Sequence, residues 1–112
     1  MLPDDRIRLR HMADAIESAL RFSRGRSRAQ YESDEMLLFA VVRAVEVVGE
    51  AASRTTTELR VAHPQIPWAA VVGMRNRLVH AYFDVDIDVV WSTVTQALPP
   101  LLDQLKTILS LP

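Results

Sequence analysis

Four polar side chains that could take part in catalysis or ligand binding lie within eight residues of each other: Arg75, Asn76, His80 and Tyr82. Arg suits phosphate binding because its planar guanidinium donates a bidentate fork. His is the side chain whose ordinary pKa allows proton transfer near neutral pH. Together Arg75 and His80 suffice for metal-free cleavage of RNA. The imidazole takes a proton from a 2′-hydroxyl or gives one to the leaving oxygen, while the guanidinium stabilises charge on the phosphorane.

Arg75 also has a structural interpretation. Val71, Leu78 and Tyr82 recur at helical spacing as an apolar stripe, and Arg75 falls on the same stripe. A guanidinium that faces inward needs an anionic partner. On a continuous helix, His80 would lie about 140° from Arg75. The two side chains could then share a site only if the helix ends near His80, or if a second subunit helps to complete the site.

A second polar feature interrupts a helix expected from Ser33 or Asp34 to about Arg54. Between residues 36 and 52 this helix is apolar almost all round, which indicates burial on every side, in part against a second subunit. Its only charged residues, at steps of three and four along one face, are Arg43, Glu46 and Glu50. They could form an ion-pair ladder, or they could line a cleft opposite Arg75. In a third, purely structural interpretation, the chain is a dimer in which Arg75 pairs with Glu46 or Glu50.

Other segments also read as helices. Asp4 or Asp5 is expected to cap a first helix, which a polar run around Gly25 ends. Gly49 lowers the stability of the second helix relative to Ala, which the close approach of a neighbouring backbone would justify. A short helix is expected at residues 58–62.

The remaining helices carry proline and aspartate signals. Pro67 is expected at the first position of the motif helix, with Trp68 as a core anchor. The spacing of Asp84, Asp86 and Asp88 could suggest a calcium loop, but the Gly and the terminal Glu of such a loop are missing. Asp86 or Asp88 should instead cap the last helix, because the positive end of a helix favours a carboxylate. Pro99-Pro100 must kink or divide that helix. With no sustained strand pattern, we expect an all-α fold, an antiparallel bundle of four main helices plus a short one.

Composition narrows the class of protein. The chain has 112 residues, no Cys, three His and a formal net charge of −1, so we expect one domain over residues 1–112, with no disulfide framework and no zinc site. No signal peptide or membrane span is visible, which predicts a soluble cytoplasmic protein with no membrane partner and no bound DNA. The first 31 residues carry seven Arg against four acids, a balance of +3. This basic region is either a local RNA contact or a solvated basic loop.

The motif resembles the signature of the HepT-like proteins, HEPN-superfamily toxins of prokaryotic toxin–antitoxin pairs. That signature is Arg, a polar residue, three further residues and His-x-Tyr, matched by Arg75, Asn76, His80 and Tyr82. Further similarity lies in Ile66-Pro67-Trp68, in Arg43, Glu46 and Gly49-Glu50-Ala51-Ala52, and in Val89-Val90-Trp91 and Leu98-Pro99. Arg77 is more polar than the apolar residue expected at its position.

The resemblance implies an HEPN-like all-α homodimer with Arg75 and His80 in a cleft at the dimer interface. It implies a metal-independent endoribonuclease that acts on cellular RNA without a cofactor, as the toxin of a type VII system. Its partner would be a minimal nucleotidyltransferase antitoxin of the MntA type, which neutralises the toxin by transferring AMP from ATP to Tyr82. The supporting site residues would be Asn76, Arg43, Glu46, Glu50 and Tyr82. The alternative is a non-catalytic helical subunit that binds a nucleotide or a partner within a nucleotidyltransferase complex.

Overall fold

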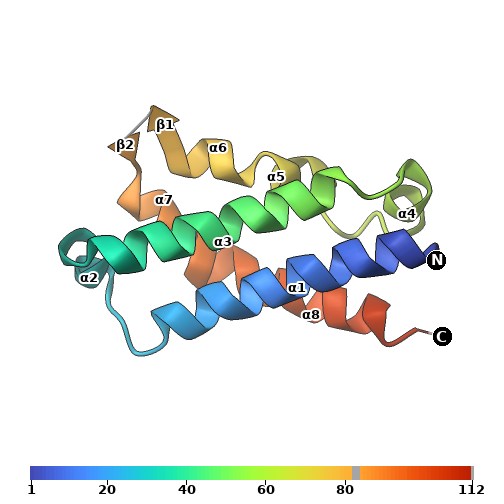
Figure 1. The fold of residues 1–112 in the computed structure, drawn as a ribbon, viewed down its shortest axis with the longest axis horizontal. Coiled ribbons are helices and arrows are strands. Elements are labelled where there is room, and N and C mark those ends of the chain that lie inside the picture. The colour runs from blue at the N-terminus through green and yellow to red at the C-terminus, as the bar shows by residue number, and fades with distance from the viewer. Residues whose placement is uncertain (82–83, 112) are drawn as a thin grey trace.

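Two long antiparallel helices, α1 (Pro3–Ser23) and α3 (Glu35–Ser53), lie side by side at the centre of the molecule (Figure 1). The computed structural model describes residues 1–81 and 84–111, with the backbone alone for residues 80 and 81. Helix α8 (Leu98–Leu109) packs on α1, and α5 (Trp68–Val72) and α6 (Met74–Leu78) pack along α3. The expected all-α fold is confirmed. None of the helices in the described residues is long and apolar enough to cross a membrane.

The three longer helices bury the faces that their apolar spacing predicts. The buried side chains are Leu9, Met12, Ile16 and Ala19 in α1, Leu37, Val41, Val45 and Val48 in α3, and Leu98, Leu101, Leu105 and Ile108 in α8. These residues form one continuous core. The same burial leaves the opposite side of α3 free to face α5, α6 and solvent.

The start of α1 differs from the prediction. The residue preceding the helix is Leu2, which makes no side-chain cap, so neither Asp4 nor Asp5 caps α1. Asp5 is instead buried, and its carboxylate accepts hydrogen bonds from the backbone N–H of Thr56 at 3.0 Å and from its hydroxyl at 2.6 Å. Thr56 in turn caps α4 (Thr57–Ala62), the short helix expected there. The carboxylate therefore joins two helices that are distant in sequence.

A short helix that the sequence did not predict, α2 (Arg28–Ser33), follows the turn at Gly25, where φ is +72°. The Gln30 side chain accepts a hydrogen bond from the Ser27 backbone N–H at 2.7 Å, which stabilises its first turn. Tyr31 is fully buried, and its hydroxyl lies 2.6 Å from that of Ser23. Burial raises the pKa of Tyr31, against the opposing effect of the Ser23 hydrogen bond.

The second predicted helix is α3, which begins beside Asp34 as expected, and Asp34 is its N-terminal cap. The Asp34 carboxylate accepts a hydrogen bond from the Leu37 backbone N–H at 3.1 Å. That bond, assisted by Arg26, holds the pKa of Asp34 below its ordinary value of 3.8. The Gly49 prediction is also confirmed, because a Cβ there would lie only 3.2 Å from the Val72 carbonyl oxygen.

The motif helix is divided at Gly73 into α5 and α6, and Pro67 lies one residue before its first position. Trp68 is buried as predicted, with its indole N–H donating to the His63 carbonyl at 3.1 Å. After Leu78 the backbone becomes extended. Two short antiparallel strands follow, β1 (Val79–Ala81) and β2 (Asp84–Val85), which the sequence did not predict.

The last predicted helix is divided, as Pro99-Pro100 requires. It consists of α7 (Ile87–Ser92), a π-helical turn at Thr93–Ala97 and then α8, with the prolines in the first turn of α8. Asp86 caps α7, as expected, by accepting from the Val89 backbone N–H at 3.1 Å. The described residues thus contain more helical segments than the four main helices and one short helix predicted, because Gly73 and the proline pair divide two of them and α2 adds another.

Candidate functional site

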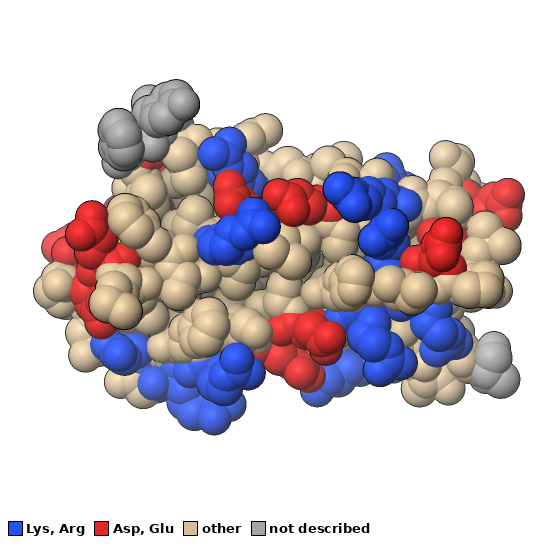
Figure 2. Space-filling view, viewed as in Figure 1, with Lys and Arg blue, Asp and Glu red and all other residues tan. Residues whose placement is uncertain are grey.

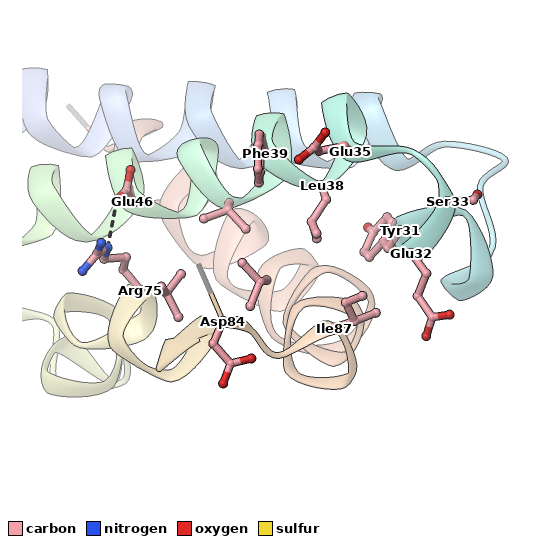
Figure 3. A pocket seen from close by; sticks show the side chains of 13 residues that line it. Tyr31, Glu32, Ser33, Glu35, Leu38, Phe39, Glu46, Arg75, Asp84 and Ile87 are labelled. Carbon is pink, nitrogen blue, oxygen red and sulfur yellow. Dashed lines mark hydrogen bonds and ion pairs between the residues drawn. The ribbon is translucent and has the colours of Figure 1, made fainter. Parts of the chain in front are cut away.

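Arg75 lies in α6 with its side chain half exposed, not on the buried stripe where the sequence predicted it. The inward positions of this segment are Trp68, Val71, Met74 and Leu78. The break at Gly73 gives Met74 the inward position and turns Arg75 toward α3. There its Nε donates to the Glu46 carboxylate at 2.8 Å, as the dashed line in Figure 3 marks.

Glu46 is the central member of a chain of ion pairs along α3. One carboxylate oxygen accepts from Arg75, and the other accepts from Arg43 at 3.3 Å. Arg43 also donates to Glu50 at 3.3 Å. The hydrogen bond that Arg43 donates to Glu46 and the negative charge of Glu50 raise the pKa of Arg43. The ladder within α3 and the pairing across to Arg75 are therefore both present.

A groove of about 740 Å³ runs from this ion pair along the N-terminal half of α3 to Tyr31 (Figure 3). Its apolar walls are Leu38, Phe39 and Val42 of α3 on one side and Val79, Val85 and Ile87 on the other. Its charged lining consists of four acids, Glu32, Glu35, Glu46 and Asp84, against Arg75. Such a lining favours apolar and cationic groups over the phosphates of RNA.

A smaller recess of about 350 Å³ lies on the other side of the Arg75–Glu46 pair, and its lining is more polar. The recess brings Arg75 and Asn76 together with Glu46, Glu50 and Ser53 of α3. The close approach of α5 to Gly49 sets the distance between these two walls. Five of the seven residues predicted for the site therefore lie in or beside one ion-pair network: Arg43, Glu46, Glu50, Arg75 and Asn76.

The other two predicted residues follow α6. Helix α6 ends at Leu78, two residues before His80. A helix end near His80 is the condition that the sequence set for its side chain to approach Arg75. The backbone of His80 is extended in β1, so the 140° separation of a continuous helix does not apply. The side chain of His80 lies outside what the structure describes, and Tyr82 lies outside the described residues. Their meeting with Arg75 stays a prediction.

Some features of the site lacked a clear signal in the sequence. Glu35 and Asp84 line the groove, although neither was singled out as a site residue. Arg77, more polar than the resemblance suggests, is exposed and donates to the Ala70 carbonyl at 3.1 Å, which stabilises the end of α5. Within the described ranges, no three His, Cys, Asp or Glu side chains are grouped so that they could hold a metal ion.

Basic side chains gather over the C-terminal end of α1 and the turn that follows it (Figure 2). Arg28 pairs with Asp88 and Glu32, and these bonds raise its pKa, the Asp88 bond most. Arg26 pairs with Asp34 at 3.3 Å. Part of the basic charge of this region is therefore neutralised within the chain.

Comparison with known proteins adds independent findings. The family model described as Ribonuclease HepT-like matches residues 12–108. A Thermococcus cleftensis protein with the name "Probable ribonuclease HepT" is 40% identical over 93 residues, which cover 83% of this chain and 84% of that protein. A candidate RNase of Caldanaerobacter subterraneus subsp. tengcongensis is 35% identical over 90% of each chain. One from Methanocaldococcus jannaschii is 31% identical over 85% of this chain and 90% of its own. No solved structure matches the chain significantly.

Proposed function

The chain belongs to the ribonuclease HepT-like family, and from that premise we propose that it is a metal-independent endoribonuclease that cleaves cellular RNA as the toxin of a toxin–antitoxin pair. Arg75 and His80 are its catalytic residues. Asn76, Tyr82 and the polar residues of α3 support them.

The observation that carries this proposal is the state of Arg75. Its side chain is half exposed, and only its Nε is engaged by Glu46. A guanidinium buried for stability would be enclosed and fully paired. The helix also ends at Leu78, two residues before His80, which supports a shared site.

The proposed reaction needs only these side chains and the RNA itself. The 2′-oxygen attacks the adjacent phosphorus, the bond from phosphorus to the 5′-oxygen breaks, and a 2′,3′-cyclic phosphate and a 5′-hydroxyl result. His80 takes the proton from the 2′-hydroxyl or delivers one to the leaving 5′-oxygen. Arg75 stabilises the negative charge that builds on the phosphorane oxygens.

Degradation of a labelled RNA by the purified protein in excess EDTA tests the activity. We expect cleavage in EDTA, with a loss of about 100-fold or more in Arg75→Ala and His80→Ala. Cleavage of the RNA by His80→Ala at the wild-type rate would refute the proposal. If neither substitution changes toxicity to cells but both weaken assembly with a nucleotidyltransferase, the chain is a binding subunit instead.

We also propose that a cognate minimal nucleotidyltransferase neutralises the toxin by transferring AMP from ATP to Tyr82. Tyr82 is the tyrosine of the motif that the chain shares with the family, and the phosphate of an AMP group on it would compete with RNA phosphate for the motif guanidinium. Intact mass after co-expression with the enzyme should rise by one or more AMP units. The increase should be absent in Tyr82→Phe, and an unchanged gain in that variant would exclude Tyr82 as the acceptor.

The protein is further proposed to act as a homodimer that uses the groove face of α3. Met36 and Phe39, three residues apart on this helix, are 84% and 55% exposed, which offers an apolar surface that a second copy could cover. Phe39 also lines the groove, and Arg75 lies at the end of that groove. A second copy on this face would therefore approach the proposed catalytic residues.

A further inference from the structure

We propose that Glu46 is a positioning residue for Arg75: its carboxylate holds the guanidinium through Nε, so that the two terminal nitrogens are presented to a substrate phosphate. This inference rests on the proposed ribonuclease function. It states how the guanidinium of Arg75, the proposed phosphate-binding group, is oriented. The bond from Arg75 Nε to Glu46 measures 2.8 Å. Within the described part of the chain, the terminal nitrogens of Arg75 make no hydrogen bond.

Glu46 is itself held in place. Its two oxygens accept from different arginines, one three residues earlier in α3 and one in α6. Its side chain is 25% exposed, compared with 62% for Arg43 and 59% for Glu50. The carboxylate is therefore the most enclosed group of the network, and it is the one group that contacts both helices.

Arg75 needs such a support because its own element is short. Helix α6 has five residues and follows the break at Gly73. A long side chain that is half exposed samples several rotamers, and fixing it in advance lowers the cost of placing its charge at the transition state. Because Glu46 engages Nε alone, a phosphate can use the remaining edge of the guanidinium without displacing the carboxylate.

This geometry predicts how removing Glu46 should separate kcat from KM. In Glu46→Gln, the side chain loses its charge, and one of the two oxygens that accept from the arginines becomes an NH2 donor, so Arg75 keeps at most a weaker, neutral hydrogen bond. Arg75 then loses its fixed orientation, and kcat should fall by about 10- to 100-fold. KM should stay the same or fall, since a negative charge beside the phosphate site has been removed. The shape of the pH profile should not change, because the acid–base group is untouched.

The matched control is Glu17→Gln. It removes the same charge and breaks a surface ion pair of the same kind, with Lys106 at 3.3 Å, but it lies on α1 and outside the proposed site. We expect it to keep kcat within about twofold, because surface ion pairs of this kind contribute little. Glu46→Asp supplies a second test. It keeps the charge but withdraws the carboxylate by one methylene, so it should lower kcat as Glu46→Gln does, even if the Gln variant does not fold.

A double-mutant cycle separates this inference from the proposed function. If Glu46 acts through Arg75, the Arg75→Ala/Glu46→Gln protein should be no less active than Arg75→Ala alone. Activity retained in Arg75→Ala would overturn the ribonuclease proposal. Loss in Arg75→Ala with unchanged kcat in both Glu46 variants would overturn the positioning role alone. A rise in kcat on removing Glu46 would also overturn it, since Glu46 would then be a competitor of the phosphate.

Discussion

The Arg75 side chain is half exposed, and this exposure is more typical of a residue that binds a ligand than of one that stabilises the fold. A carboxylate at 2.8 Å from an exposed guanidinium gains little net free energy, because water competes for both charges. The partner, Glu46, keeps a second contact with Arg43 when Arg75 is removed. We therefore expect Arg75 to be dispensable for the fold.

Arg75→Ala is accordingly expected to lower the free energy of unfolding by less than about 1 kcal/mol. The measurement is urea denaturation followed by circular dichroism, compared with the wild-type protein. A buried structural arginine would give a much larger loss, about 3–5 kcal/mol. A loss of that size would return Arg75 to the structural interpretation that the sequence left open.

At the scale of the helices, the start of α3 depends on the charge of one residue. The Leu37 N–H bond, with Arg26, lowers the pKa of Asp34 in the folded protein. A depressed folded pKa means that the stabilisation is complete above the unfolded pKa, near 3.9, and is lost as pH falls through the folded pKa. Asp34→Asn keeps an equally good capping oxygen but does not titrate.

The wild-type protein should therefore exceed Asp34→Asn in stability at pH 6, and the difference should shrink as pH is lowered from about 4 toward 2. Urea midpoints of both proteins across this range provide the measurement. A difference that stays constant with pH would show that the cap acts only through its geometry.

Helix α3 also contains the closest helix–helix contact near the site. A Cβ on Gly49 would meet the carbonyl oxygens of Val72 and Val71 at 3.2 and 3.3 Å. These oxygens cannot easily move, because α5 is anchored by the buried Trp68. The clash should outweigh the gain in helix propensity, which is about 1 kcal/mol.

Gly49→Ala is expected to destabilise the protein by about 1–3 kcal/mol and to lower activity by shifting α5 and the arginine that follows it. Gly73→Ala is the matched control, since its Cβ would have a single neighbour, the Ala69 carbonyl oxygen, at 3.4 Å. That change should stay below about 1 kcal/mol. Equal effects of the two substitutions in chemical denaturation would argue against a special contact at Gly49.

The elements that could be predicted from the sequence are those with local signals. Asp34 and a long apolar run define α3, and Pro99-Pro100 predicts the division before α8. Helix α2 has one local signal, the Ser27 and Gln30 pair of a capping box, but its six residues also depend on contacts of Tyr31 with Ser23 and with the distant Trp91 ring, 5.5 Å away between centroids. Local patterns contain no information about such partners.

The same distinction applies to the site. The spacing of Glu46 and Glu50 predicted a polar face that could meet Arg75, because periodicity along one helix is visible in the sequence. The direction of Arg75 was predicted wrongly. That direction depends on the break at Gly73, where the backbone leaves the helix at φ −85° and ψ 2°, and on Met74 taking the inward position. A helical repeat extended across the glycine could not predict this change.

At the scale of the whole molecule, the two ends differ in character. The end that carries α2 and the start of α3 combines a groove of about 740 Å³ with the exposed Met36 and Phe39. The opposite end, which carries α4 and both termini (Figure 1), also exposes large apolar side chains, but none of them lines a described pocket: Val61 at 72%, Met1, Leu2 and Leu111. An apolar surface that continues into a groove is typical of an interface, whereas exposed apolar residues without an adjoining groove are not.

If the groove face joins two copies, the wild-type protein should have twice its chain mass of 12.6 kDa by light scattering at micromolar concentration. Phe39→Glu should weaken the dimer by at least about tenfold, because it would bury a charge at an apolar contact. The same substitution at Val61 should leave the mass unchanged. RNA cleavage should fall with the dimer fraction in Phe39→Glu and recover as protein concentration rises, because Arg75 lies at the end of the same groove. A Phe39→Glu protein that stays dimeric would place the interface elsewhere. A wild-type protein that is monomeric and fully active would show that no dimer is needed for cleavage.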